Sequence, residues 1–230
     1  MEILPGGYTL KIYDGCFPLS TDSMALAHFT RLPKNARVLD LGAGCGTLGL
    51  LLCAQRSDCH VTGIELTEAA HQGALENIAR NRLESRMESI CADLREAGLF
   101  SAGSFDVCIS NPPYFTGGPA AKLKDARRTD LCSMDALMGT AAKALKFGGD
   151  FFLVHRPEAL AQLCICAGKF SLEPKRICLL RHREGDPISL VLAQCRKGAK
   201  PSLLWEELCL FNKDGAPTED YKRIYHQQEA

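Results

Sequence analysis

The sequence predicts an α/β fold in which a mostly parallel sheet carries helices on both faces. Between residues 36 and 195, short apolar runs alternate with longer stretches of helical periodicity, which is typical of a parallel sheet wound on both sides. With 230 residues, the chain is long enough for one large domain with its own buried core. The last two apolar runs have no helix between them, so we expect an antiparallel hairpin at one edge of the sheet.

Seven strands and four helices account for this region. Short, largely apolar runs predict strands at residues 36–41, 60–66, 89–94, 105–110, 150–155, 174–182 and 187–195. Longer stretches of helical spacing predict helices at residues 47–56, 67–82, 133–147 and 157–169. Gly148 and Gly149 are expected to end the third helix, because glycine favours helix C-termini.

The strands and helices divide the chain into a core and two extensions. The core is expected to span residues 36–196. Residues 1–35 and 197–230 do not continue the alternation and are too short to be domains. We therefore expect both segments to pack onto the core.

The composition excludes several classes of protein. The formal net charge is zero, so a nucleic-acid partner would need a local basic face rather than an overall positive charge. The 12 cysteines form no CxxC pair and accompany no secretory signal, which favours reduced core thiols over disulfides or a metal site. No apolar run approaches the roughly 20 residues that span a bilayer. We expect a cytoplasmic, monomeric protein without a metal.

A glycine-rich turn follows the first strand and predicts a ligand site. Gly42, Gly44 and Gly46 allow positive φ angles and a close approach of backbone to a ligand. A GxGxxG pattern is also present and would suit a dinucleotide, but Asp40 beside the turn would repel a pyrophosphate. The same carboxylate suits S-adenosylmethionine, which carries an ammonium group and a sulfonium.

Two further carboxylates end the second and third strands. Glu65 is placed to accept hydrogen bonds from ribose hydroxyls, and Asp93 to accept one from the adenine amine of the cofactor, with Leu94 beside it. Because parallel strands bring their carboxyl ends to one edge of the sheet, Asp40, Glu65 and Asp93 are expected to lie together. The alternative is that each carboxylate only caps the helix that follows it.

The fourth strand is followed by Asn111-Pro112-Pro113-Tyr114. The two prolines make this turn rigid, and rigidity serves placement of a substrate. The Asn111 side-chain oxygen and the Pro112 carbonyl can accept both N–H hydrogens of an aromatic amine, which makes its nitrogen more nucleophilic and stabilises the charge developing there. Tyr114 offers a flat face for stacking. The alternative is a proline-rich turn with a surface aromatic residue.

These motifs resemble, in order and spacing, the class I methyltransferases of the amino-methylating NPPY type over residues 36–115. The whole chain resembles one branch, the bacterial tRNA (adenine-N6)-methyltransferases that modify the adenine beside the anticodon of a valine tRNA. The matching segments are GGYTLKIYDGCFPLSTDSMALAHF, ARRTDLCSMDALM, FFLVHRPEALAQL, EPKRI and DGAPTEDYKRIY. Arg128 and Thr129 depart from this branch, which often has His-Glu there.

The resemblance implies a Rossmann-like class I methyltransferase fold, S-adenosylmethionine as cofactor and transfer to an adenine N6 in RNA, expected to be tRNA near the anticodon. It also implies that residues 1–35 help to close the cofactor pocket. Asn111 would contact both cofactor and substrate. Substrate RNA is expected to meet the basic residues after the proline turn, Lys122, Lys124, Arg127 and Arg128, and a second basic stretch over residues 169–200.

Other activities remain open at this point. A protein glutamine-N5 methyltransferase would use the same turn on an amide, but about 35 residues before the first strand leave little room for the helical N-terminal domain that such enzymes carry. Methylation of DNA adenine or of guanine N2 uses the same amine chemistry. A non-catalytic RNA-binding homologue would have lost motif residues, whereas all are present here. An NAD-linked oxidoreductase is disfavoured by Asp40 and by the proline turn.

Overall fold

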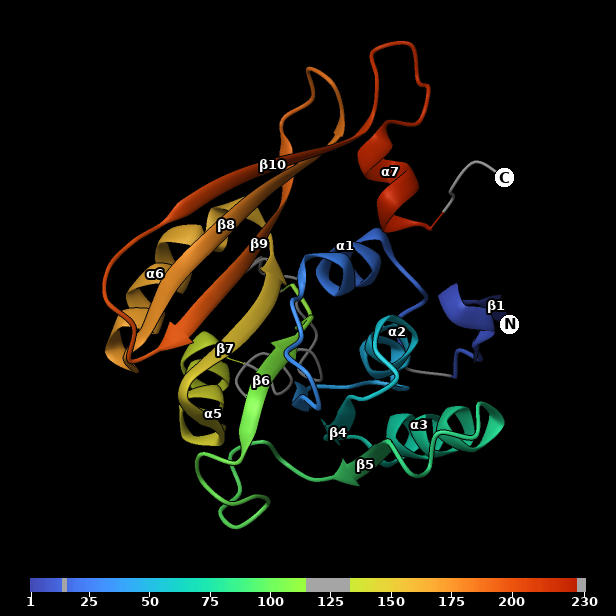
Figure 1. Cartoon of the computed structure of the whole chain (residues 1–230), viewed down its shortest axis with the longest axis vertical. Coiled ribbons are helices and arrows are strands. Elements are labelled where there is room, and N and C mark those ends of the chain that lie inside the picture. Colours follow the sequence, from blue (N-terminus) through green and yellow to red (C-terminus); the bar gives the residue numbers. More distant parts are fainter. Residues whose placement is uncertain (14–15, 115–132, 227–230) are drawn as a thin grey trace, which may run out of the picture.

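Two sheets of very different size organise the described part of the chain, which in this computed structural model comprises residues 1–13, 16–114 and 133–226 (Figure 1). Within these residues the main sheet has eight strands. They are β3 (Arg37–Leu41), β4 (His60–Glu65), β5 (Met87–Cys91), β6 (Phe105–Ser110), β7 (Leu145–His155), β8 (Leu172–Arg183), β9 (Ile188–Lys197) and β10 (Leu204–Phe211). The small sheet pairs β1 (Glu2–Ile3) with β2 (Thr9–Leu10) in antiparallel register.

The strand order in the main sheet is β10-β8-β9-β7-β6-β3-β4-β5. Among the described strands of this sheet, β9 alone runs antiparallel to its neighbours, β7 and β8. The order changes direction at β3, which lies between β4 and β6. Open sheets of this kind bind ligands at such a switch point, outside the carboxyl ends of the strands.

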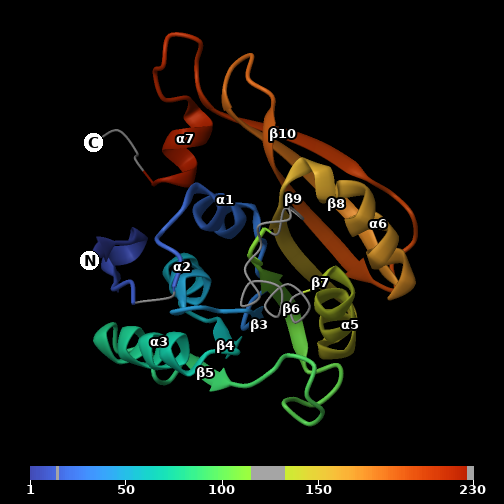
Figure 2. The same ribbon diagram turned by 180° about the vertical axis from the view of Figure 1, so that it is seen from behind.

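Helices cover both faces of the sheet (Figures 1 and 2). One face carries α1 (Thr21–Phe29), α2 (Thr47–Gln55), α3 (Glu68–Arg80) and α7 (Glu219–Ile224). The other face carries α5 (Met134–Ala144) and α6 (Leu160–Lys169). Short 3-10 turns occupy Pro5–Gly7 and Pro157–Ala159. The predicted α/β class, with a mostly parallel sheet between helices, is confirmed.

The two faces hold separate hydrophobic cores because side chains of a strand alternate across the sheet. In β7, Phe152 packs in the core beneath α1 and α2, while Phe151 packs in the core beneath α5 and α6. Both phenylalanines are fully buried. Phe29 of α1 meets Phe152 edge to face at 5.9 Å between ring centroids, which fixes α1 on the sheet.

The sheet has one strand more than the seven expected, because part of the segment 197–230 joins it. β10 pairs in parallel with β8, so the β8–β9 hairpin does not form the edge of the sheet. Leu210 of β10 is buried in the core, and the guanidinium of Arg176 in β8 holds the carboxylate of Glu206 at 2.9 Å through each of two nitrogens. Burial and this ion pair attach the C-terminal segment to the sheet.

The helix predicted over residues 133–147 ends earlier than expected. α5 stops at Ala144, and Leu145 already pairs with Phe105 of β6 as the first residue of β7. Gly148, with φ of +81°, lies inside the irregular start of β7 rather than at a helix end. Leu145 is fully buried, so strand pairing and burial outweigh the local helical periodicity.

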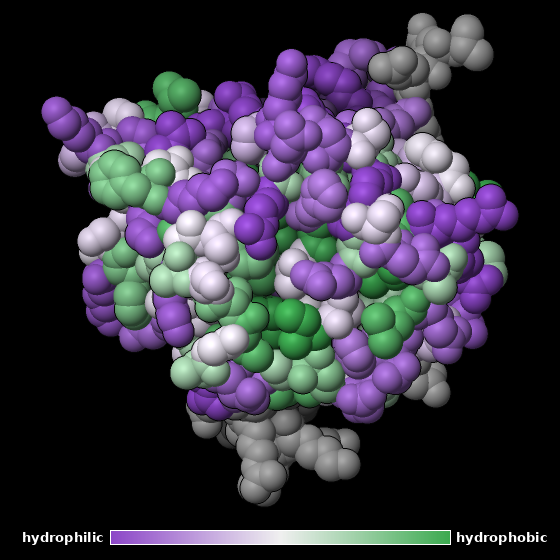
Figure 3. Space-filling view, turned by 60° about the horizontal axis from the view of Figure 1, so that its bottom comes forward, coloured by the Kyte–Doolittle hydropathy of each residue, from purple (hydrophilic) through white to green (hydrophobic). Residues whose placement is uncertain are grey.

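The 11 cysteines among the described residues are all free thiols, and seven of them are buried. This placement agrees with the expectation of reduced core residues. In the part of the chain that the structure describes, no helix is both long and apolar enough to cross a membrane. On the face shown in Figure 3, polar and apolar side chains are interspersed.

Candidate active site

The glycine turn between β3 and α2 bends the backbone around an open space. Gly42, Gly44 and Gly46 have φ angles of +77°, +56° and +85°. The N–H groups of Gly42 and Ala43 both donate to the Ile64 carbonyl, at 2.9 and 3.0 Å, which ties the turn to β4. A Cβ atom at Gly42 or Gly44 would meet no atom within 4 Å in the described structure. The turn therefore leaves room for a ligand against its backbone.

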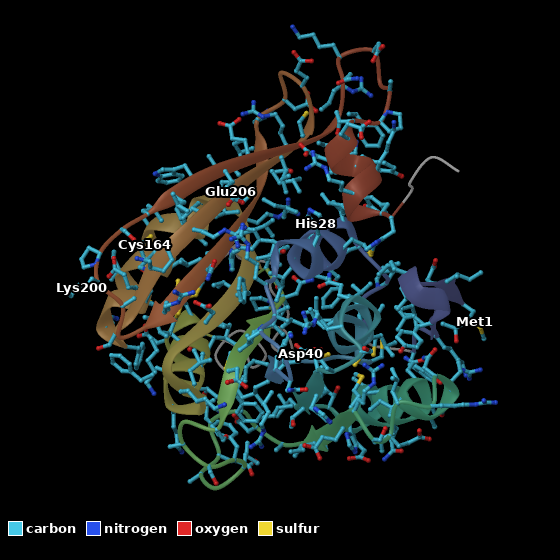
Figure 4. The ribbon with its side chains drawn as sticks, viewed as in Figure 1. Met1, His28, Asp40, Cys164, Lys200 and Glu206 are labelled. Carbon is cyan, nitrogen blue, oxygen red and sulfur yellow. The ribbon has the colours of Figure 1, made fainter. Side chains whose placement is uncertain are left out.

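Asp40 lies under this turn, in the interior of the molecule (Figure 4). Its side chain is 1% exposed, and neither carboxylate oxygen has a hydrogen-bond partner among the described residues. Burial, with the nearby charge of Glu65, raises the pKa of Asp40 to about 7. A buried carboxylate without a partner is unfavourable, and a cationic ligand in the adjoining space would relieve it. This feature fits S-adenosylmethionine.

Glu65 connects the end of β4 to the glycine turn. One carboxylate oxygen accepts from the Gly44 N–H at 3.0 Å, and the other accepts from the N–H and hydroxyl of Thr67 at 2.9 and 2.8 Å. The side chain is 8% exposed. A carboxylate has about four acceptor positions, so three protein hydrogen bonds leave room for a ligand hydroxyl.

Asp93 follows β5, the strand beside β4, where the Ala92 N–H donates to the Glu65 carbonyl. Its carboxylate accepts from the backbone N–H of Arg95 at 2.9 Å and from the guanidinium of Arg95 at 2.6 Å. These hydrogen bonds lower the pKa of Asp93. Leu94 is buried in the core of the α5 face. The three predicted carboxylates thus come from adjacent strands, β3, β4 and β5, at one edge of the sheet.

The proline turn follows β6, next to β3. The buried Ser110 hydroxyl donates to the Leu41 carbonyl at 2.8 Å and links this turn to the start of the glycine turn. The Asn111 Nδ2 donates to Ser23 Oγ at 3.0 Å, and the Tyr114 hydroxyl donates to Asn111 Oδ1 at 3.2 Å. The amide of Asn111 is therefore held from both ends.

Tyr114 packs against the end of β7. Its ring lies edge-on to the His155 imidazole, 5.1 Å between centroids, and the Arg156 guanidinium lies 5.2 Å from the ring centroid. Burial and the charge of Asp22 raise the pKa of Tyr114, so the hydroxyl stays protonated and remains a donor. Burial lowers the pKa of His155.

Two residues that the sequence did not point to connect the N-terminal segment to the site. Ser23 of α1 is one, through its hydrogen bond with Asn111. Asn77 of α3 is the other: fully buried, it accepts from the Lys11 N–H at 3.0 Å and donates to the carbonyls of Lys11 and Cys45 at 2.9 and 3.0 Å. Cys45 belongs to the glycine turn. An isolated polar residue on a helix gives no signal for such contacts in the sequence.

The basic residues expected to meet RNA divide into two groups. Lys122, Lys124, Arg127 and Arg128 lie outside the described residues. In the stretch 169–200, most cations are engaged within the protein. Four form ion pairs, Lys169 with Asp135 at 3.3 Å, Arg176 with Glu206 at 2.9 Å, Arg181 with Glu207 at 3.1 Å, and Arg196 with Asp150 at 2.9 Å. This stretch therefore offers less free positive charge than its composition indicates.

Comparison with known proteins places these features in a family. Residues 20–165 match the methyltransferase small domain family. A protein of Bacteroides fragilis described as a tRNA1(Val) (adenine(37)-N6)-methyltransferase is 33% identical over 180 residues, 76% of each chain. A protein of Serratia proteamaculans with the same description is 28% identical over 95% of this chain and 88% of its own.

Solved structures share the fold. A predicted O-methyltransferase of Agrobacterium tumefaciens superposes with a TM-score of 0.74 at 23% identity, covering 91% of this chain and 98% of its own. A 16S rRNA N2 G1207 methyltransferase of T. thermophilus, solved with AdoMet and guanosine, has a TM-score of 0.57 at 26% identity, covering 80% of this chain and 45% of its own. The Rossmann-like methyltransferase fold is confirmed.

Proposed function

Because the chain belongs to the methyltransferase small domain family, we propose that it transfers a methyl group from S-adenosylmethionine to the N6 amine of an adenine in tRNA. The observation that carries the proposal is the Asn111 amide, fixed at the end of β6 beside the strand whose buried Asp40 lacks a partner among the described residues. The residue that would accept the hydrogens of the substrate amine, Asn111, and the residue that would face the positive charge of the cofactor, Asp40, thus lie at the ends of neighbouring strands, β6 and β3.

We assign the cofactor to the space above the glycine turn. Asp40 would face its positively charged part, Glu65 its ribose, and Asp93 with Leu94 its adenine, while Asn111 would border the methyl group. Gly42 and Gly44 let the backbone approach closely, whereas a Cβ atom at Gly46 would lie 2.8 Å from Met87 Cε, so that glycine serves the packing of the turn. When bound, S-adenosylmethionine supplies an electrophilic methyl group on a sulfonium.

The chain's own chemistry is placement of the substrate amine. The Oδ1 of Asn111 carries a second lone pair beside the one that accepts from Tyr114, so it can accept one amine hydrogen. The carbonyl of Pro112 would accept the other, which directs the nitrogen lone pair toward the methyl group and stabilises the positive charge forming on nitrogen. The ring of Tyr114 supports the planar base by stacking. No histidine is required, because a cationic amine loses its extra proton readily.

The names of the relatives and the physics of base extraction support tRNA as the proposed substrate. A base in a loop leaves its stack at less cost than one in a duplex, which suits an anticodon loop. Lys122, Lys124, Arg127 and Arg128 remain proposed contacts to its phosphates. We propose a cytoplasmic enzyme that acts as a monomer, since one chain supplies every residue assigned to the site.

Asn111→Ala tests the amine-holding role. We expect methyl transfer to tRNA to be lost, because the truncated side chain cannot accept the N–H hydrogen. Affinity for S-adenosylmethionine, measured by calorimetry, should persist. Unchanged transfer by this variant would contradict the proposed mechanism. Methylation of guanine N2, which the T. thermophilus neighbour's name describes, is the second candidate, and the methylated nucleoside distinguishes it.

A further inference from the structure

The amide of Asn111 is hydrogen-bonded to a residue that lies outside the strand-and-turn motif. Ser23, in the first turns of α1, comes 88 positions earlier in the chain and places its hydroxyl 3.0 Å from Asn111 Nδ2. Ser23 is 6% exposed, so water does not compete freely for this contact. Among the described residues, the hydroxyls of Ser23 and Tyr114 are the two hydrogen-bond partners of the Asn111 side chain.

The orientation of this amide decides what it can do to an amine. With Oδ1 toward the substrate, Asn111 accepts an N–H hydrogen. If the amide plane were rotated by half a turn, the Nδ2 hydrogens would face the N–H hydrogens of the amine, and no hydrogen bond could form between these two donors. An amide nitrogen is only a donor, so this orientation requires a hydrogen-bond acceptor beside Asn111 Nδ2, on the side away from the substrate. We propose that Ser23 is a positioning residue, whose hydroxyl oxygen accepts from Asn111 Nδ2 and thereby keeps Oδ1 turned toward the substrate amine. This proposal rests on the proposed function.

The hydrogen bond at Asn111 Oδ1, the other end of the amide, is consistent with this orientation. Tyr114 donates to Oδ1, and a phenol hydroxyl carries its proton at neutral pH, so the donor is in place. A donor at the oxygen and an acceptor at the nitrogen are the pair that the proposed orientation requires.

The helix that carries Ser23 is itself fixed. Ser20 caps its N-terminus by accepting from the Ser23 N–H at 3.4 Å. At the other end, the Arg176 guanidinium lies 4.1 Å from the centroid of the Phe29 ring, and it donates to the Phe29 carbonyl at 3.4 Å. A helix held at both ends keeps the Ser23 hydroxyl at a constant position relative to β6.

The same helix provides a matched control. Thr21 also uses its hydroxyl over a long sequence distance, in a 2.8 Å hydrogen bond with the Tyr225 hydroxyl just after α7. Thr21→Val therefore removes one hydrogen bond of α1, as Ser23→Ala does, but leaves Asn111 untouched.

The first test observes the amide directly, without any substrate. In 15N–1H spectra of the full chain, the side-chain NH2 signal of Asn111 is identified by its loss in Asn111→Ala. We expect Ser23→Ala to shift this signal and to speed its hydrogen exchange about tenfold, the effect of losing one hydrogen bond. Thr21→Val should leave the signal in place. An unchanged Asn111 signal in Ser23→Ala overturns the proposal.

The second test distinguishes positioning of the Asn111 amide by Ser23 from a general effect on the stability of α1, and from a failure of the proposed function. Ser23→Ala should lower kcat for tRNA methylation about tenfold with an unchanged Kd for S-adenosylmethionine, and Ser23→Thr, which retains the hydroxyl, should restore most of it. An equal loss of kcat in Thr21→Val would show a general effect of α1 and overturn the proposal. If wild-type protein methylates no tRNA although the amide signal responds to Ser23→Ala, the proposed function fails while the positioning by Ser23 stands.

Discussion

Replacing Asp40 by asparagine should stabilise the free protein more at pH 8 than at pH 5. The carboxylate is buried with no hydrogen-bond partner in the part of the chain that the structure describes, and burial with the charge of Glu65 raises its pKa from 3.8 to about 7. A raised pKa means that the folded protein holds a proton that the unfolded chain has released. The contribution of Asp40 to stability is therefore complete below the unfolded pKa and is lost as the pH rises through the folded pKa.

The size of the effect follows from the two pKa values. Integrating the difference in bound protons between pH 5 and pH 8 gives a loss of about 2–3 kcal/mol for the wild type. Asparagine does not titrate. Any penalty for burying its amide is constant with pH, and the titration of groups that both proteins share cancels in the difference between them. The stability advantage of Asp40→Asn over the wild type should therefore grow by about 2–3 kcal/mol across this range.

Urea unfolding of both proteins at pH 5, 6, 7 and 8, without cofactor, measures this difference. Asp93→Asn is a suitable control, because Asp93 is hydrogen-bonded to Arg95 and its pKa is lowered, not raised. The reasoning would be refuted by an advantage of Asp40→Asn that stays constant or shrinks between pH 5 and pH 8.

Three further predictions concern the site. Glu65→Ala should weaken binding of S-adenosylmethionine at least about tenfold in calorimetry, because a ribose acceptor and the tether to the glycine turn are both lost; normal affinity would remove the ribose assignment. Asn77→Asp should also weaken cofactor binding, since a carboxylate cannot donate to the Cys45 carbonyl of the glycine turn. The control Asn81→Asp loses donors only to the Thr9 and Asn77 carbonyls, so it should lower the free energy of unfolding and leave the cofactor Kd unchanged. Tyr114→Phe should reduce kcat less than Tyr114→Ala in tRNA methylation assays, because phenylalanine keeps the stacking face, and equal losses would argue against stacking.

The parts of the site that lie at strand ends could be predicted from the sequence. In a parallel sheet the carboxyl ends of neighbouring strands meet at one edge, so Asp40, Glu65 and Asn111 could be placed together from their positions after apolar runs. The positive φ angles of Gly42, Gly44 and Gly46 could be predicted because glycine is the residue type that adopts them most readily. The fold class could be predicted because the alternation of strands and helices shows in local periodicity.

Contacts between distant segments could not be predicted in this way. Ser23 meets Asn111 across 88 positions, and Asn77 meets Lys11 across 66, so neither pairing leaves a local pattern. The sequence did not predict β10 because Glu206 and Glu207 interrupt its apolar run, and only the structure shows that Arg176 and Arg181 compensate these charges.

Direct identification of the methylated nucleoside tests the central claim. The purified enzyme would be incubated with methyl-labelled S-adenosylmethionine and total tRNA from a strain lacking the gene, with DNA and protein extracts of that strain in parallel. Digestion and mass spectrometry of the tRNA should give labelled N6-methyladenosine, and none with Asn111→Ala. Label found only in protein, in DNA or in N2-methylguanosine would contradict the account.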